Sequence, residues 1–166
     1  LREVMHDHVP QSLREILAGS PDATELVLTN PFAFVVGLIA DQSVRVETAW
    51  RLPYGLAQRL SIEPTVLSLC EVDEVHGALA ERPALHRYPR ATAERVVRAA
   101  RRVEDAYGGD AAEVWSSARD AAEVAERLLA FDGIGAKKAS LGVQLLAREL
   151  GVRVAAGAVD AHGPAL

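Results

Sequence analysis

The chain has 166 residues, of which 49% are hydrophobic, and carries a formal net charge of −5. This length suits a single domain or a compact pair of lobes with a buried core. A net negative charge is unfavourable for a nucleic-acid binder, because affinity for DNA depends on neutralising phosphates, so any DNA-binding surface must gather its basic residues locally.

The chain has one cysteine, Cys70. A lone cysteine excludes an intrachain disulfide framework and an iron–sulfur cluster held by four cysteines of this chain. A metal site at His6, Asp7 and His8 would need a further ligand, and none is evident nearby, so we expect surface histidines and no metal. The longest apolar run, residues 31–40, is too short to span a bilayer, and no signal-peptide pattern opens the chain. We therefore expect a cytoplasmic protein that does not bind membranes.

Alanine, leucine, arginine and glutamate dominate the chain, and runs typical of strands are scarce, which predicts an all-helical fold. The first predicted element is a short amphipathic helix over residues 1–17, interrupted by Pro10 and followed by a turn at residues 19–22. Residues 24–29 fit either a short extended segment or the edge of a helix.

Asn30 and Pro31 form a strong helix start, because asparagine caps free amides and proline suits the first helical position. Residues 32–40 are apolar on all sides and should form the buried central helix. This helix gives way abruptly to Asp41 and Gln42. Such polar residues either face a cleft or simply mark the surface.

A second apolar pattern over residues 44–52 predicts a helix that Pro53 breaks. Two short helices are predicted over residues 64–70 and 72–81. His76 has apolar neighbours, which favours a buried or half-buried structural role over a catalytic one.

Residues 86–90 predict a loop with two basic residues, a histidine and a tyrosine, and residues 91–107 predict an amphipathic helix that ends at a pair of glycines. Valines gather on one face of this helix, and Arg95, Arg98 and Arg102 lie nearly opposite. Such an arginine stripe is either a solvated face or a track for phosphates.

Asp120 is the expected cap of a helix over residues 121–130, which leads into the segment most indicative of a function. Gly133 and Gly135 form a tight connection there, and a second helix is predicted over residues 136–150. Such a helix-hairpin-helix turns backbone N–H groups outward at a helix N-terminus, where they hold a phosphate without reading the DNA sequence.

Four side chains of this hairpin bear on its role. Ile134 should anchor the hairpin in the core, and Lys137 and Lys138 lie in the first turn of the second helix. Cations are mildly unfavourable at a helix N-terminus, which favours a functional role for the pair over two ordinary surface lysines. Asp132 places a negative charge next to the expected phosphate.

Three stretches of the chain, in order, resemble the helix-hairpin-helix (HhH-GPD) DNA glycosylases, the superfamily of endonuclease III and 8-oxoguanine glycosylase. Residues 30–50 resemble the family's buried helix, whose terminal glutamine, here Gln42, fills the gap left by an extruded base. Residues 129–139 resemble the hairpin, with Lys137 at the nucleophile of bifunctional members and Asp132 in place of the usual proline.

The third stretch, residues 159–162, resembles the segment that holds the family's essential aspartate, here Asp160. The resemblance implies that a damaged nucleotide is rotated out of the duplex into a pocket between two lobes. Lys137 would then attack C1′ as a neutral amine, and Asp160 would stabilise the charge on the sugar or activate the attacking group. His162 is either a helper or a structural residue. The residues expected to contact DNA are Gln42, Gly133, Ile134, Gly135 and Lys138, the last through a phosphate.

The resemblance implies an all-α, two-lobed helical fold in which residues 1–166 form one unit. Residues 30–135 would form the central lobe with the hairpin, and residues 1–29 and 136–166 the second lobe. It implies a monomeric base-excision repair glycosylase with abasic-site lyase activity on damaged duplex DNA at the bacterial nucleoid, without cofactor or iron–sulfur cluster. The alternatives are a monofunctional glycosylase in which Asp160 activates water, a non-catalytic DNA-binding module, and an acidic protein-interaction domain.

Overall fold

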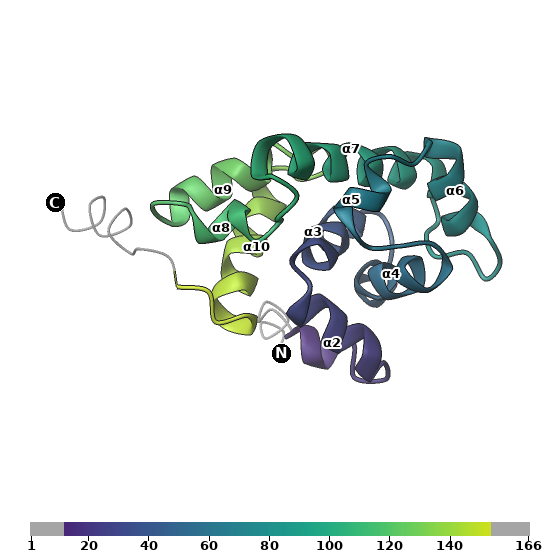
Figure 1. The fold of residues 1–166 in the computed structure, drawn as a ribbon. Helices are drawn as coiled ribbons and strands as arrows, with labels where there is room; N and C mark the ends of the chain where they lie inside the picture. The colour runs from purple at the N-terminus through teal and green to yellow at the C-terminus, as the bar shows by residue number, and fades with distance from the viewer. Residues whose placement is uncertain (1–11, 154–166) are drawn as a thin grey trace, which may run out of the picture.

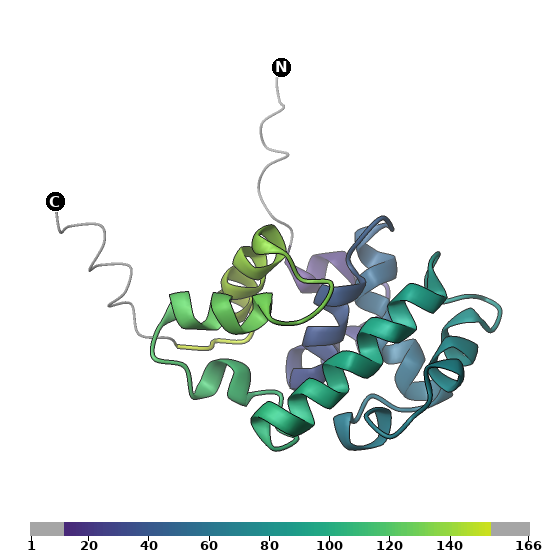
Figure 2. The same cartoon turned by 90° about the horizontal axis from the view of Figure 1, so that it is seen from above.

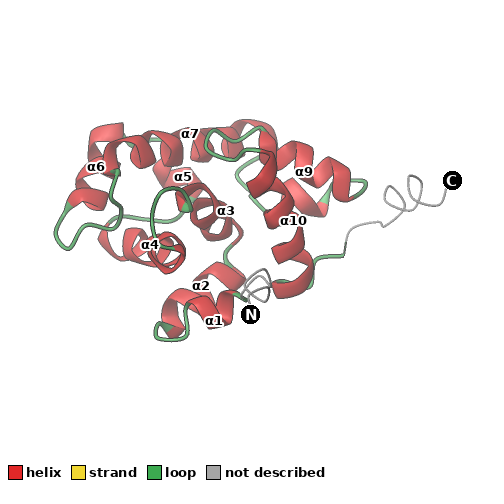
Figure 3. Cartoon of the chain, turned by 180° about the vertical axis from the view of Figure 1, so that it is seen from behind, coloured by secondary structure: helices red, strands yellow, loops and turns green. Residues whose placement is uncertain are grey.

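The computed structural model describes residues 12–153, in which all regular structure is helical (Figures 1 and 3). This agrees with the predicted all-helical class. The predictions for residues 1–11 and 154–166 lie outside the described residues, and the proposed division into two lobes stays a prediction. The helices are α1 (Leu13–Ile16), α2 (Pro21–Thr29), α3 (Pro31–Ala40), α4 (Val46–Arg59), α5 (Pro64–Leu67), α6 (Val72–Ala80), α7 (Pro89–Tyr107), α8 (Glu113–Ser116), α9 (Ala121–Leu129) and α10 (Ala136–Glu149).

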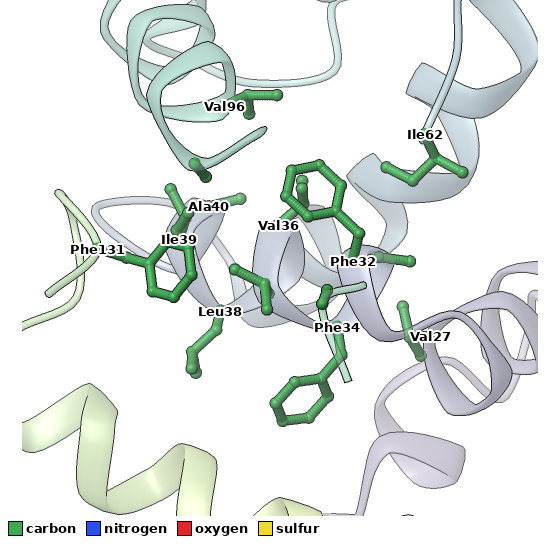
Figure 4. Close-up of a cluster of buried hydrophobic side chains, with 14 of the residues drawn as sticks. Val27, Phe32, Phe34, Val36, Leu38, Ile39, Ala40, Ile62, Val96 and Phe131 are labelled. Carbon is green, nitrogen blue, oxygen red and sulfur yellow. The ribbon is translucent and has the colours of Figure 1, made fainter. Parts of the chain in front are cut away.

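Helix α3 is the centre of the described fold, as its apolar sequence predicts. Every residue from Phe32 to Ala40 is buried. The Asn30 side chain caps its first turn by accepting a hydrogen bond from the Ala33 N–H at 3.0 Å. Figure 4 shows α3 side chains among residues of α2, α7 and the hairpin. The end of α3, which Gln42 follows two residues later, is therefore packed from several sides.

Helix α4 corrects a prediction, because Pro53 lies inside the helix and does not end it. An interior proline removes one backbone hydrogen bond and crowds the preceding turn, at a cost of about 3 kcal/mol or more. Leu52, Pro53 and Leu56 are all buried, and Trp50 is only 1% exposed. The burial of this apolar face offsets the local cost of the proline.

Helix α7 crosses the described part of the chain, with α6 packed against it and with α9 and α10 to one side of it (Figure 2). Its valines are buried as predicted, and Gly108 ends it in the left-handed conformation at φ 61°. Residues 24–29, for which the sequence allows an extended segment or a helix, belong to α2. The direction of α7 brings its arginine face to the hairpin.

Within residues 12–153, no single helix is long and apolar enough to cross a membrane. The pair α2 and α3 passes on length and composition but is bent by 111°.

Candidate functional site

The hairpin between α9 and α10 has the predicted geometry. Phe131 is 2% exposed and Ile134 is 4% exposed, so both anchor the turn in the core as expected for Ile134. Gly133 has φ 100°, and a Cβ there would lie 3.0 Å from the Arg95 side chain, which explains the glycine. Gly135 is the N-cap of α10 and offers no side chain to the first-turn amides. These amides are the expected phosphate donors.

Lys138 joins the hairpin helix to the end of α3. Its Nζ donates hydrogen bonds to the Leu38 carbonyl at 2.8 Å and to the Ile39 carbonyl at 3.1 Å. These carbonyls lie in the last turn of α3, where a cation is electrostatically favourable. The side chain that we expected on a phosphate therefore bridges two helices in this structure.

The lysine amine and the carboxyl of Asp41 lie in one half-buried environment. Burial lowers the pKa of Lys138 from 10.5 to about 8, against the opposing effect of Asp41, and Arg95 lowers it further. Burial also raises the pKa of Asp41, which Lys138 and the Trp50 side chain act to lower. The site therefore contains an amine that loses its proton more readily than an ordinary lysine.

His86 supports the same helix end and is a residue that sequence reasoning placed in a loop. It is 5% exposed, and its Nε2 lies 3.0 Å from the Ala40 carbonyl. Its Nδ1 accepts a hydrogen bond from the Tyr88 N–H at 3.0 Å, so Nε2 carries the proton that is donated to Ala40. Burial lowers the pKa of His86. The partners of His86 are remote in sequence or set by loop geometry, so no local pattern could have revealed this role.

The hairpin and the end of α3 enclose one side of a hollow of about 560 Å³. Gln42 reaches it from the bend that follows α3, and Lys138 reaches it from α10. Lys137, by contrast, is exposed and does not line this hollow. The lining residues are Gln42, Arg95, Leu129, Ala130, Phe131, Asp132, Gly133, Ile134, Gly135 and Lys138.

The arginine stripe of α7 faces the hairpin, and Arg95 of this stripe also lines the hollow. Arg95 Nη1 donates to Gln42 Oε1 at 3.3 Å, and Arg95 Nε lies 4.0 Å from Asp132 Oδ2. Arg98 forms a direct ion pair with Asp132. The Arg102 guanidinium lies 5.8 Å from the centre of the Phe131 ring. The three arginines thus contact the hairpin region in order along α7.

A second hollow of about 620 Å³ lies beyond the turn that follows Gln42. It contains none of the residues predicted to act on DNA, so we place the candidate site at the hairpin. Asp160 and His162, the other predicted site residues, lie outside the described residues. Within residues 12–153, no group of three histidine, cysteine, aspartate or glutamate side chains is placed to hold a metal ion. The lining residues of the second hollow are Ser43, Val44, Arg45, Thr48, Ala84, His86 and Arg87.

The described helices have the helical fold of endonuclease III. Two solved structures show this similarity, each with 20% sequence identity, a TM-score of 0.55 and coverage of 84% of this chain. One is a trapped covalent endonuclease III–DNA intermediate, an estranged-adenine complex, and the other is a non-covalent endonuclease III–DNA complex. The chain spans 58% and 57% of those two proteins. No protein-family model and no curated protein sequence matches the chain.

Proposed function

We propose that this chain binds duplex DNA and acts in base-excision repair as a DNA glycosylase. The observation that carries the proposal is that Gln42 and the hairpin line one hollow although they lie far apart in sequence. The two endonuclease III structures of similar fold are both DNA complexes, which supports the same class of partner here.

In this proposal the hairpin holds a backbone phosphate. The first-turn amides of α10 have no side-chain cap, and the first turn has no acidic residue, so an anion is the suitable partner. Gln42 then enters the base stack and fills the gap left by the extruded nucleotide. Extrusion is needed because the glycosidic bond of a stacked nucleotide is out of reach of the protein.

The proposed chemistry uses a lysine amine and Asp160. The amine attacks C1′ and forms a C–N bond as the bond to the base breaks, and the base leaves with its electron pair. The sugar ring then opens by cleavage of the C1′–O4′ bond with protonation of O4′, which gives a Schiff base. This intermediate permits β-elimination of the 3′ phosphate. Asp160 stabilises the positive charge on the sugar or deprotonates the attacking group. By its position after Gly135, Lys137 is the first candidate for the nucleophile.

Lys138 is the second candidate, and its environment favours it. Its amine lies at the hollow, and its pKa of about 8 gives a larger neutral fraction near neutral pH than an ordinary lysine has. Two hydrogens of a neutral amine satisfy the Leu38 and Ile39 carbonyls, which leaves its lone pair free to react.

Borohydride trapping tests the lyase and assigns the lysine. The chain is incubated with duplexes that carry an abasic site or a panel of base lesions, and covalent adducts are resolved by electrophoresis. Loss of the adduct in Lys137→Ala, with retention in Lys138→Ala, assigns the nucleophile to Lys137, and the reverse pattern assigns it to Lys138. No adduct with any substrate would contradict the lyase.

The released base separates the remaining alternatives. Base release without a trapped adduct, abolished by Asp160→Asn, indicates a monofunctional glycosylase in which Asp160 activates water. Duplex binding with neither base release nor a trapped adduct indicates a non-catalytic hairpin module and overturns the proposed enzyme.

A further inference from the structure

Asp132 holds two arginines of α7 at the rim of the hollow. Arg98 pairs with its carboxylate directly, and the Arg95 Nε lies 4.0 Å from Oδ2. Arg95 and Arg98 are three residues apart, so they share one face of the helix. The structure thus places a carboxylate between two guanidinium groups directly beside the hairpin glycines.

This ion pair is open to water and therefore exchangeable. The side chain of Asp132 is 47% exposed and that of Arg98 is 60% exposed. Exposed pairs of this kind contribute only about 0–1 kcal/mol to stability. Another anion of suitable geometry can replace the carboxylate at little cost to the fold.

A phosphodiester is the anion that suits these groups. Guanidinium groups bind the oxygens of phosphate and carboxylate with the same planar arrangement of donors. Arg95 also donates to Gln42, so the two arginines lie next to the residue that we propose enters the base stack. A phosphate there would belong to the backbone beside the extruded nucleotide.

We propose that Arg95 and Arg98 form a phosphodiester-binding site of this chain, and that Asp132 occupies it in the free protein as a substitute for the phosphate. DNA must then displace the carboxylate, and the negative charge of Asp132 lowers the affinity of the site. This inference rests on the proposed binding of duplex DNA, because it names two arginines that contact the backbone and one residue that competes with it.

The charge of Asp132 can be removed without a change of shape by Asp132→Asn. Fluorescence anisotropy with a labelled duplex carrying an abasic-site analogue gives the affinity over a range of salt concentrations. The expected gain for Asp132→Asn is about tenfold at low salt, because a repulsive charge close to a phosphate is removed. The slope of log affinity against log salt should also become steeper by roughly one to two units, since each phosphate neutralised contributes about one.

Asp73→Asn is the matched control. Asp73 forms a similar exposed ion pair with Arg90 on α7, at 2.7 Å, so its replacement changes the net charge equally. We expect at most a small change of affinity from this control. In the Asp132→Asn background, Arg98→Gln should reverse most of the gain, which identifies the freed arginine as its source. Thermal melts of all variants check that each is folded.

The outcomes separate this inference from the proposed function. If the unaltered chain binds the duplex but Asp132→Asn gains no more than Asp73→Asn, the arginine site is wrong while DNA binding stands. The arginine site is also wrong if the gain of duplex affinity in Asp132→Asn persists after Arg98→Gln and Arg95→Gln are added. If neither the unaltered chain nor Asp132→Asn binds the duplex, the proposed function itself fails.

Discussion

Lys138 links α10 to α3, and its ionisation should appear in the stability of the fold. In the folded protein its pKa is about 8, against 10.5 for an ordinary lysine. Between these pH values the unfolded chain retains a proton that the folded protein has released. The contribution of Lys138 to the free energy of unfolding should therefore rise with pH from about 8 to 10.5, and stay level below pH 8.

Urea unfolding of the unaltered chain and of Lys138→Met, measured at several pH values, isolates this contribution. Groups such as Tyr54 and Cys70 titrate in both proteins, so their effect on the free energy of unfolding cancels when the two proteins are compared. The free energy of unfolding of the unaltered chain should increase relative to the variant as the pH rises through this window. A difference that is flat with pH would show that the amine is not desolvated.

His86 is expected to matter for stability more than its place in a loop suggests. His86→Ala removes a buried ring and two hydrogen bonds, from Nε2 to the Ala40 carbonyl and from the Tyr88 N–H to Nδ1. The expected loss is about 2–4 kcal/mol in the free energy of unfolding. The half-buried His76 on α6 is the control, and His76→Ala should cost less than about 1 kcal/mol. Equal losses at the two positions would contradict the bracing role of His86.

At the scale of elements, the contact between α3 and α4 depends on Gly37. An added Cβ at Gly37 would overlap the buried ring of Trp50, whereas Gly77 in α6 has open space around it. Gly37→Ala should therefore destabilise the protein by about 1–3 kcal/mol despite the higher helix propensity of alanine. Gly77→Ala should stabilise it by up to about 1 kcal/mol. Urea unfolding measures both, and a stabilising Gly37→Ala would refute the tight packing.

The helices that the sequence predicts well have capping residues at their own ends. Asn30 caps α3, Asp120 caps α9 and Gly108 ends α7 because each acts on backbone groups a few residues away. The continuation of α4 through Pro53 could not be predicted from such local signals. Whether a helix continues through a proline depends on what its far side buries, and that is a tertiary property.

The residues of the candidate site also differ in whether local sequence or tertiary packing determines their position. The hairpin with Ile134 follows from local sequence, while its resemblance to a known family suggested Gln42 as a partner. The positions of Arg95, Arg98 and Lys138 depend on how α7 and α10 cross the end of α3. A helical wheel does not contain that information, so the sequence alone does not distinguish a solvated arginine face from one that contacts the hairpin.

At the scale of the whole molecule, the distribution of charge reconciles an acidic chain with the proposed binding of DNA. The net charge is −5, yet Arg95 and Lys138 line one hollow, and Arg98 pairs with Asp132 in its lining. Nearby basic residues can attract a phosphate backbone even where the net charge of the chain repels it, because salt screens distant charges more than near ones. Salt should therefore weaken duplex binding strongly.

The proposed DNA binding is tested most directly by the affinity of the chain for a duplex with an abasic-site analogue, compared with its affinity for an intact duplex. Gly135→Asp is the decisive variant, since this position has φ −90° and open space, and an aspartate there would cap α10 as Asp120 caps α9. We expect Gly135→Asp to weaken binding to both duplexes, and Gln42→Ala to remove the preference for the abasic analogue. Unchanged affinities for both duplexes in both variants would contradict the proposed DNA binding.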